Sequence, residues 1–398
     1  MIEHLSARLI PLSLAAGHGV KKGRDPTAMT ARGRVAHLTS VHPPYDRRIC
    51  QQLDTLAQAG WEVYLVAPEG RFPLHSATHL SIPKARTRLA RALISAWQVF
   101  TQARKSGARI CHFHDPELLP IGVLLSLTGR KVVYDVHEDM PLLVLNKPWL
   151  KPWLRRPLSG LIAAVEWLAT RLCFSAVVAA TPPIARRFPS ATTATVQNYP
   201  DIGQAPTEGA GTPLDAREDR AVYIGVLDKN RGVREIIQAL ALSTNPKTSL
   251  ILGGAFSGEG FEEDCRALPA WDRVDFRGWL DRAQVKTALG EAKVGLVTLA
   301  PIPNYLEAYP TKLFEYMAAG IPVVASDFPL WRAIVEGAEC GLLVDPESPE
   351  EIAEAMDWLL AHPEDAARMG ANGKKAVAHT YNWEQEGAKL TALYERLT

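Results

Sequence analysis

The chain has 398 residues, of which 47% are hydrophobic and 22% charged, and its formal net charge is +1. This length and apolar content suffice for two domains with full cores, and the balanced charge gives no reason to expect a nucleic-acid partner. The five cysteines are isolated, with no CxxC pair, which argues against a disulfide framework or a zinc site and indicates a reducing compartment.

The N-terminal 33 residues differ from the rest of the chain. Their apolar run follows Glu3 and Arg8 and lacks the cationic start and small-residue cleavage site of a signal peptide. We therefore expect residues 1–33 to form a disordered tail. Because ordered sequence begins at about Arg34, Met29 is a candidate for the natural start.

Residues 34–200 alternate between strand-like and helix-like patterns. Apolar runs at 34–40 and 61–68 flank an amphipathic segment, which predicts a βαβ unit and a doubly wound parallel sheet. Ligands of such sheets bind beyond the carboxyl ends of the strands. No G-x-G-x-x-G motif indicates a dinucleotide there. The loop after the first strand carries the polar candidates His42, Tyr45, Asp46 and Arg47.

A helix predicted over residues 85–106 leads to a third strand that ends in a histidine–aspartate pair. We expect His112 and His114 to point to opposite faces of the sheet, one of them buried and the other near Asp115. A fourth strand, beginning at Lys131, repeats this arrangement, which favours a functional site over ordinary core histidines. No third ligand at a fixed spacing supports a metal site. The polar residues of this fourth segment are Asp135, His137, Glu138 and Asp139.

Aromatic and cationic side chains are mixed in residues 146–158, as is typical of segments at a membrane interface. The apolar run at 161–180 is nearly long enough to span a bilayer, but Glu166 and Arg171 would each cost roughly 2.5–3.5 kcal/mol at mid-span. We therefore expect a buried helix from about Leu158 that runs into a strand. The alternative for the aromatic segment is a surface loop packed on its own domain. The candidate membrane contacts are Trp149, Trp153, Arg155 and Arg156.

The second half of the chain repeats the alternation of strands and helices. Residues 201–219 are polar and rich in proline and glycine, which indicates a linker. Residues 220–378 then predict a second doubly wound domain, and a last amphipathic helix occupies 379–398. Lys229 and Arg231 follow the first strand of this domain beside a predicted helix N-terminus, where two cations suit a phosphate.

The most informative stretch is 301–327, which predicts a loop, a short helix from about Thr311 to Ala319 and a buried strand. Pro310 occupies a position that helix starts accept, and Gly320 one that ends helices. The pattern is also ordinary α/β punctuation. If functional, the helix start is an anion site because its free amides lie at the positive end of the helix dipole. The expected amide donors are Tyr309, Thr311, Lys312 and Leu313.

Charged side chains around this helix support the anion site. Lys312 adds a full charge where the helix dipole disfavours a cation, and a bound anion would explain this placement. Glu307 and Glu315 lie eight positions apart, so two carboxylates can flank whatever the helix start binds.

From about residue 34 to 398 the chain resembles a retaining glycosyltransferase of the GT-B fold, from the large family-4 group (glycosyl transferases group 1). The motifs that carry the resemblance are DRRICQQLDTLAQAGWEV, ICHFHDPELLP, VVYDVHEDMP, VQNYPD, YIGVLDKNRGVREIIQAL, FRGWL, EAYPTKLFEYMAAGIPVVASD and GLLVDPESPEEIAEAM. The resemblance implies an α/β protein with two doubly wound Rossmann-like domains facing across a cleft. Residues 34–200 would bind the acceptor, residues 220–378 a nucleotide-diphosphate sugar, and the helix at 379–398 would cross back to the first domain.

The resemblance also implies roles for single residues. Glu315 would hold the ribose hydroxyls, Glu307 would contact the sugar, and His114 would lie near it. The family commonly has arginine where Val226 stands, and Lys229 and Lys312 are the candidates to replace it. The implied catalytic residues are His114, Asp115 and Glu307. The implied donor-binding residues are Lys229, Arg231, Thr311, Lys312, Leu313 and Glu315. The implied acceptor-side residues are His42, Tyr45, Asp46, Arg47, His137 and Glu138.

The chemistry of glycosyl transfer agrees with these residues. The reaction passes through an oxocarbenium-like centre and releases a nucleotide diphosphate, so its main need is to stabilise charge on that leaving group. Lys229, Arg231 and Lys312 could do so, and we expect no metal and no cofactor.

We expect a cytoplasmic enzyme of cell-surface polysaccharide synthesis that is peripheral on the inner face of the cytoplasmic membrane. It would contact anionic lipid and use a glycan or lipid-linked acceptor. The alternatives are a nucleotide-sugar epimerase or hydrolase on the same fold, or a non-catalytic partner that retains it.

Overall fold

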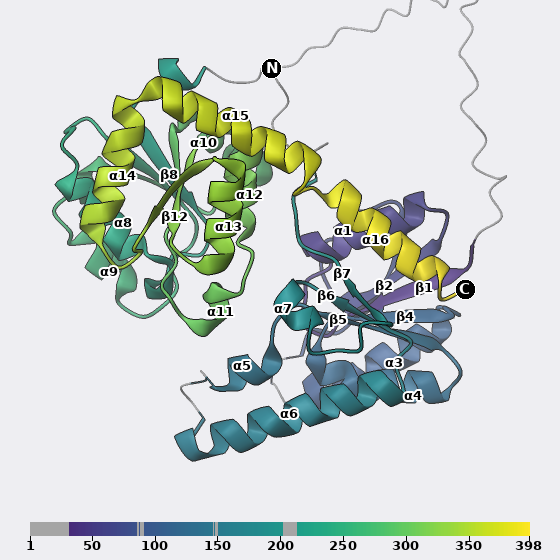
Figure 1. The fold of residues 1–398 in the computed structure, drawn as a ribbon. Coiled ribbons are helices and arrows are strands. Elements are labelled where there is room, and N and C mark those ends of the chain that lie inside the picture. Colours follow the sequence, from purple (N-terminus) through teal and green to yellow (C-terminus); the bar gives the residue numbers. More distant parts are fainter. Residues whose placement is uncertain (1–31, 86, 88–90, 146, 148–149, 202–212) are drawn as a thin grey trace, which may run out of the picture.

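The computed structural model describes residues 32–398 except 86, 88–90, 146, 148–149 and 202–212. Nearly all of the expected N-terminal tail, Trp149 and most of the expected linker lie outside the described residues. Figure 1 shows two α/β domains that follow one another along the chain, each built around its own sheet.

The first domain has a seven-stranded sheet with the order β3-β2-β1-β4-β5-β6-β7, and its neighbouring strands are parallel. The order reverses between β1 and β4, and in such sheets the carboxyl ends of the strands at this switch point form the ligand site. The strands are β1 (Arg34–Leu38), β2 (Glu62–Pro68), β3 (Ala77–Ile82), β4 (Ile110–Phe113), β5 (Lys131–Val136), β6 (Ala176–Ala179) and β7 (Thr193–Thr195). The helices are α1 (Arg47–Gln58), α3 (Ala96–Lys105), α4 (Leu119–Leu127), α5 (Met140–Leu145), α6 (Pro152–Leu172) and α7 (Pro182–Ala185).

The second domain has a six-stranded parallel sheet with the order β10-β9-β8-β11-β12-β13, so its switch point lies between β8 and β11. The strands are β8 (Arg220–Ile224), β9 (Ser249–Gly253), β10 (Val274–Gly278), β11 (Val294–Val297), β12 (Val323–Ser326) and β13 (Gly341–Val344). The helices are α8 (Val233–Leu242), α9 (Phe261–Arg266), α10 (Arg282–Glu291), α11 (Pro303–Leu306), α12 (Thr311–Ala318), α13 (Pro329–Ala338), α14 (Pro349–Ala361) and α15 (Pro363–His379).

Both sheets are buried on their two faces, as parallel sheets are, and each domain has two apolar clusters, one for each face. The predicted pair of doubly wound domains is therefore confirmed. The expected helix start at Thr311 is also present, and Gly320 follows the helix with the left-handed φ of 71° that its position requires.

The last helix, α16 (Trp383–Glu395), returns to the first domain after α15, as Figure 1 shows in yellow. The indole of Trp383 donates a hydrogen bond to Thr55 on α1 over 2.8 Å. The carboxylate of Glu386 accepts one from the amide of Gln197 over 2.8 Å. Tyr394, near the end of α16, is fully buried in the core of the first domain. The end of the chain thus completes the core of its first half.

Three local expectations need correction. The edge strand β3 was not predicted, because its sequence ATHLSI alternates only weakly. The helix expected over 85–106 is a π-helical turn at Arg91–Ser95 followed by α3. The helix expected from Leu158 begins at Pro152 and is not buried, because only Glu166, Ala169 and Thr170 of α6 are inaccessible.

Candidate functional site

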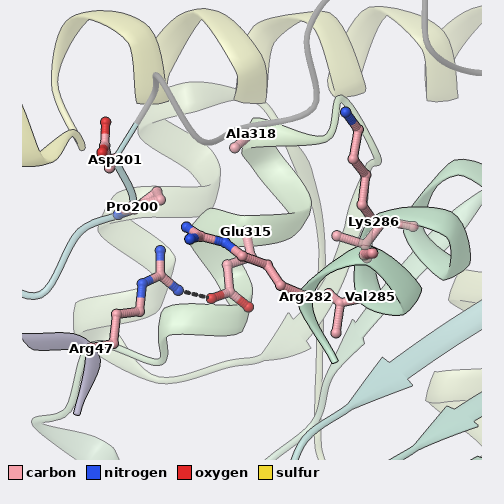
Figure 2. A pocket seen from close by; sticks show the side chains of 10 residues that line it. Arg47, Pro200, Asp201, Arg282, Val285, Lys286, Glu315 and Ala318 are labelled. Carbon is pink, nitrogen blue, oxygen red and sulfur yellow. Dashed lines mark hydrogen bonds and ion pairs between the residues drawn. The ribbon is translucent and has the colours of Figure 1, made fainter. Parts of the chain in front are cut away.

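A cavity of about 420 Å³ lies between the domains, where α10 and α12 of the second domain approach the start of α1 (Figure 2). Its apolar wall includes Val285, Leu289 and Ala318. Its charged lining consists of Arg47, Asp201, Arg282, Lys286 and Glu315.

Glu315 forms an ion pair with Arg47 across this cavity, as the dashed line in Figure 2 shows. Arg47 was predicted on the acceptor side, and it does come from the first domain, but its guanidinium reaches the donor-side carboxylate. Arg282, which was not predicted, extends across the same cavity in Figure 2, whereas Lys286 points away from Glu315. Any ligand that uses the Glu315 carboxylate must therefore displace Arg47 or share the carboxylate with it.

A second cavity, of about 370 Å³, contains predicted residues from both domains. His137 and Glu138 from the end of β5 face Arg231 and Glu307 from the second domain. Ala308 and Tyr309, just before α12, complete this side. The structure thus brings the predicted acceptor-side and donor-side residues together, and it places Glu307 and Glu315 in separate cavities.

Lys312, at the start of α12, is almost fully buried, with an exposed fraction of 7%. Its Nζ lies 3.5 Å from the ring centre of Tyr223 and has no hydrogen-bond partner among the described residues. A Cβ added at Gly225 would come within 3.0 Å of that Nζ. Burial, followed by the charge of Arg231, lowers the pKa of Lys312 well below its ordinary value. An ammonium in this state is poorly compensated by the protein itself.

The two other predicted donor-side cations, Arg231 and Lys229, differ in position. Arg231 lines the second cavity and lies 3.4 Å from the carboxylate of Asp228. Lys229 is exposed and lines neither of the two cavities, whereas the Nζ of Lys312 lies beside Gly225, the residue before Val226.

Thr311 is the first residue of α12, but the donor role predicted for Leu313 is wrong. The amide of Leu313 donates to the carbonyl of Pro310 over 3.1 Å, and its side chain is buried in the core.

Asp135 is the centre of a buried polar cluster at the switch point of the first sheet. Its carboxylate accepts hydrogen bonds from Arg48 over 2.9 Å and from Gln52 over 2.8 Å. Three imidazoles surround the same carboxylate, with nitrogens 3.3 to 3.5 Å from Oδ2. They belong to His112, His114 and His137.

Further contacts connect these imidazoles in a chain. Nδ1 of His114 lies 3.1 Å from Nε2 of His137, and Nε2 of His114 lies 3.0 Å from Nδ1 of His37. The hydroxyl of Tyr394 then lies 3.2 Å from Nε2 of His37 and 2.7 Å from Nδ1 of His112. Only His137, at the start of this chain, lines a cavity.

Burial keeps the inner histidines neutral. It lowers the pKa of His114 to about 3, and it also lowers the pKa values of His37 and His112. For Asp135, burial would raise the pKa, but Arg48 and His137 outweigh burial and hold the pKa well below its ordinary value. The inner part of the cluster therefore consists of one carboxylate, one guanidinium and the neutral imidazoles of His37, His112 and His114.

The catalytic roles expected of His114 and Asp115 are not compatible with direct substrate contact in this structure. The expectation that His112 and His114 point to opposite faces is wrong, because residues two apart on a strand share a face. Their rings stack with centroids 4.8 Å apart, and both are buried. The buried carboxylate of Asp115 accepts hydrogen bonds from Thr39 and from the amide of Val41, so it organises the loop after β1.

His42 is held in that loop between two carboxylates, 3.3 Å from Asp46 and 3.4 Å from Asp115. Burial disfavours its charged form, but the two carboxylates outweigh burial and raise the pKa of His42. Asp46 also caps α1 by accepting from the amide of Ile49. Tyr45 is 62% exposed and lines neither cavity.

His112, His114 and Asp135 have ligand atoms within 4.8 Å of one another, a spacing that could hold a metal ion. The guanidinium of Arg48 already binds this carboxylate, and a second cation there would be repelled. Hydrogen bonding accounts for the cluster better. The absence of a metal in the reaction stays a prediction.

The roles of several residues of the site were not predicted from the sequence. A carboxylate inside the apolar strand KVVYDV was a usable signal for the central role of Asp135. The sequence contains no local signal for His37 and Tyr394, because their contact joins positions 357 residues apart.

A pair of doubly wound domains with a cleft between them is the GT-B fold, and this chain has that arrangement. The model for "Glycosyl transferases group 1" matches residues 207–376, and that for "Glycosyltransferase Family 4" matches residues 46–191. The chain belongs to this family of glycosyltransferases.

Curated relatives match over part of their length. An MMP alpha-(1->4)-mannosyltransferase of Mycolicibacterium hassiacum is 31% identical over 42% of this chain and 40% of its own. A D-inositol 3-phosphate glycosyltransferase of Corynebacterium glutamicum is 35% identical over 46% of this chain and 44% of its own. The chain thus spans less than half the length of these two relatives.

Solved structures share the fold over most of both chains. Sucrose-phosphate synthase from Thermosynechococcus elongatus has a TM-score of 0.73 and 21% identity, covering 92% of this chain and 99% of its own. Anabaena HepE, solved with UDP-glucose, has a TM-score of 0.70 and 17% identity, covering 92% and 100%.

The buried histidines predict that acid destabilises the protein. Unfolded histidines bind protons below about pH 6.5, whereas His37, His112 and His114 bind them only at lower pH when folded. Each can therefore lower the free energy of unfolding by up to about 1.4 kcal/mol per pH unit below that point. His42, Glu166 and Glu235, with raised pKa values, act in the opposite direction, so the net loss is smaller than the sum for the three buried histidines.

Urea unfolding at about pH 7 and pH 5 measures this loss. The variant His75→Gln, at an exposed histidine, should keep the same dependence. A free energy of unfolding that stays constant or rises toward pH 5 would show that the buried histidines are charged in the folded protein.

Proposed function

We propose that this chain transfers a sugar, with retention of configuration and without a metal, from a nucleotide-diphosphate sugar to a glycan or lipid-linked acceptor in cell-surface polysaccharide synthesis. The observation that carries the proposal is Lys312, a buried lysine whose amino group has no hydrogen-bond partner among the described residues, at the positive end of α12. The charge of Arg231 acts on the same group. Two cations at a helix start favour a multiply charged anion such as a diphosphate.

The same anion site would assist the reaction. Departure of the nucleotide diphosphate builds negative charge on the phosphate oxygens, and cations fixed in place beforehand stabilise this charge without rearranging. Glu315 would bind the ribose hydroxyls after releasing Arg47, and Glu307 would face the sugar from the second cavity. His137 and Glu138 would face the acceptor. The solved HepE complex with UDP-glucose supports a nucleotide sugar as the donor class.

Incubation with radiolabelled nucleotide sugars and membrane lipid extract tests this function. Transfer predicts label in lipid or glycan, whereas a hydrolase would release free sugar and an epimerase would convert the donor. A donor that is neither bound nor altered across a panel of nucleotide sugars would indicate a non-catalytic partner and contradict the proposal.

Lys312→Met should weaken binding of the nucleotide diphosphate and raise the stability of the free protein. Methionine fills similar space without a buried, uncompensated ammonium, so we expect a higher Tm. We expect at least about a tenfold loss in affinity, since a charge-assisted hydrogen bond contributes roughly 1.5–3 kcal/mol.

Calorimetric titration with UDP and GDP, together with thermal unfolding, gives both readouts. Lys247→Met, at an exposed lysine of the second domain that lines neither cavity, is the matched control and should change neither. Wild-type affinity in Lys312→Met would remove this lysine from the donor site.

We propose that the first domain also contacts an anionic membrane through an apolar surface on its outer helices. We define this surface by the exposed side chains of α6 together with those of α3 and α4, which lie on the same side of the sheet in Figure 1. On α6 the spacing of the apolar residues is helical, so they form one stripe. Its members are Leu154, Leu161, Val165, Leu168 and Leu172, with Trp153 beside the first turn and Trp97, Leu124 and Leu127 on the neighbouring helices.

The charges around this surface favour anionic lipid as its partner. In the described parts of α3, α4 and α6 the only acidic residue is Glu166, whose side chain is inaccessible and paired with Arg187. Arg156 and Arg171 are exposed, whereas Arg155 donates to the carbonyl of Leu150. Among the described residues no helix is long and apolar enough to cross a membrane. Apolar side chains among cations suit peripheral contact with a negative bilayer surface.

Sedimentation with vesicles tests the surface. The protein should pellet with anionic vesicles more than with neutral ones, and a combined Leu161→Ser, Leu168→Ser and Leu172→Ser variant should lose most of this binding. Leu242→Ser and Trp279→Ser, at exposed positions of the second domain, are matched controls and should pellet as before. Equal pelleting of the triple variant, or a wild-type dimer that this variant dissociates, would contradict membrane contact.

A further inference from the structure

The hydrogen-bond chain from His112 through Tyr394 to His137 contains four contacts, each between two side chains that can donate or accept. A neutral imidazole has one N–H and one lone pair, and a hydroxyl has one proton to donate. Each contact needs one proton. A chain of neutral groups is therefore satisfied only when all donors point the same way, and it has two possible polarities.

The two polarities differ in how many N–H groups face the carboxylate of Asp135. In the first, His137 donates to His114, and donation continues through His37 and Tyr394 to His112. The N–H on Nε2 of His112, which the chain does not use, then faces the carboxylate at 3.5 Å from Oδ2. The N–H on Nε2 of His137, 3.3 Å from Oδ2, is shared between His114 and the carboxylate, and one lone pair, on Nδ1 of His114, also faces Oδ2.

In the opposite polarity two nitrogen lone pairs would face the carboxylate at those positions. Only the N–H on Nδ1 of His114, 3.3 Å away, would point toward it. Two donors against a charged acceptor are more favourable than one donor and two lone pairs. The first polarity is therefore preferred, and it places the proton of His137 on Nε2.

We propose that Tyr394 is a positioning residue of the acceptor site, whose hydroxyl fixes the tautomer of His137 through His37 and His114. In this tautomer Nδ1 of His137 carries a lone pair. Since His137 lines the second cavity beside Glu138 and opposite Glu307, it offers a hydrogen-bond acceptor to a hydroxyl of the incoming sugar acceptor. This last step rests on the proposed function, whereas the tautomer itself does not.

Helix α16 then has a function besides packing, because it carries the hydroxyl that orients the chain. Tyr394 is fully buried and is the link in the chain that joins His37 to His112. Without its hydroxyl, the N–H on Nε2 of His37 loses its acceptor. His37 is then more stable with its proton on Nδ1, so that His114 donates to Nε2 of His137. This donation opposes the preference of Asp135 for an N–H on the same nitrogen, and His137 is no longer held in one tautomer.

Nitrogen NMR of the full chain labelled at histidine tests the inference on the free protein, with His137→Gln to identify the signals of His137. The wild-type should show one tautomer with the proton on Nε2. Tyr394→Phe, which removes only the hydroxyl, should show His137 in both tautomers. Under the proposed function, the same variant should lose turnover severalfold with the KM for the donor unchanged.

Tyr134→Phe is the matched control in the same domain. Tyr134 is equally buried, and its hydroxyl donates to Glu166 over 2.9 Å, outside the chain. It should lower stability without changing the His137 spectrum. A proton on Nδ1 of wild-type His137 overturns the inference even if Tyr394→Phe fails to fold, as does an unchanged His137 spectrum in Tyr394→Phe. The predicted tautomer in a protein without transferase activity would support the Tyr394 chain and overturn the proposed function.

Discussion

The buried ion pair between Asp135 and Arg48 is the interaction on which the first domain depends. A carboxylate in the middle of a sheet is costly unless charge and hydrogen bonds compensate it fully. Arg48 and Gln52 from α1 satisfy part of it, and imidazoles surround the rest. One buried charge thus fixes the position of α1, the rotamers of three histidines and, through Tyr394, the end of α16.

The second domain has the opposite arrangement. There the buried charge is the ammonium of Lys312, and the described residues offer it an aromatic face but no hydrogen-bond acceptor. The first domain compensates its buried charge completely, whereas the second leaves its buried charge uncompensated. The two domains therefore differ in what they can bind. Under the proposed function, the first would hold a fixed polar surface for the acceptor, whereas the second would gain free energy when an anion binds.

Periodicity and residue spacing were sufficient to predict the regular elements of both domains. The alternation of apolar runs gave both doubly wound sheets, and the sequence around Pro310 gave α12 and its charged start. Periodicity also shows that Leu161, Leu168 and Leu172 share a helix face, but not whether another element covers that face, so α6 was wrongly expected to be buried. The Asp135 cluster depends on parallel register, which places His37 level with His112, and on a helix from the far end of the chain.

The interdomain ion pair at the cleft differs in exposure from the buried ion pair of the first domain. The side chains of Arg47 and Glu315 are 40% and 30% exposed, so solvent screens their attraction and their separation costs about 1 kcal/mol or less. Ribose hydroxyls that donate to the Glu315 carboxylate can offset a loss of this size. The pair between Arg48 and Asp135 is inaccessible, and breaking it would leave uncompensated charge. Under the proposed function, the donor side of the cleft would therefore exchange partners during a reaction cycle, while the acceptor side, held by Asp135 and Tyr394, would keep one geometry.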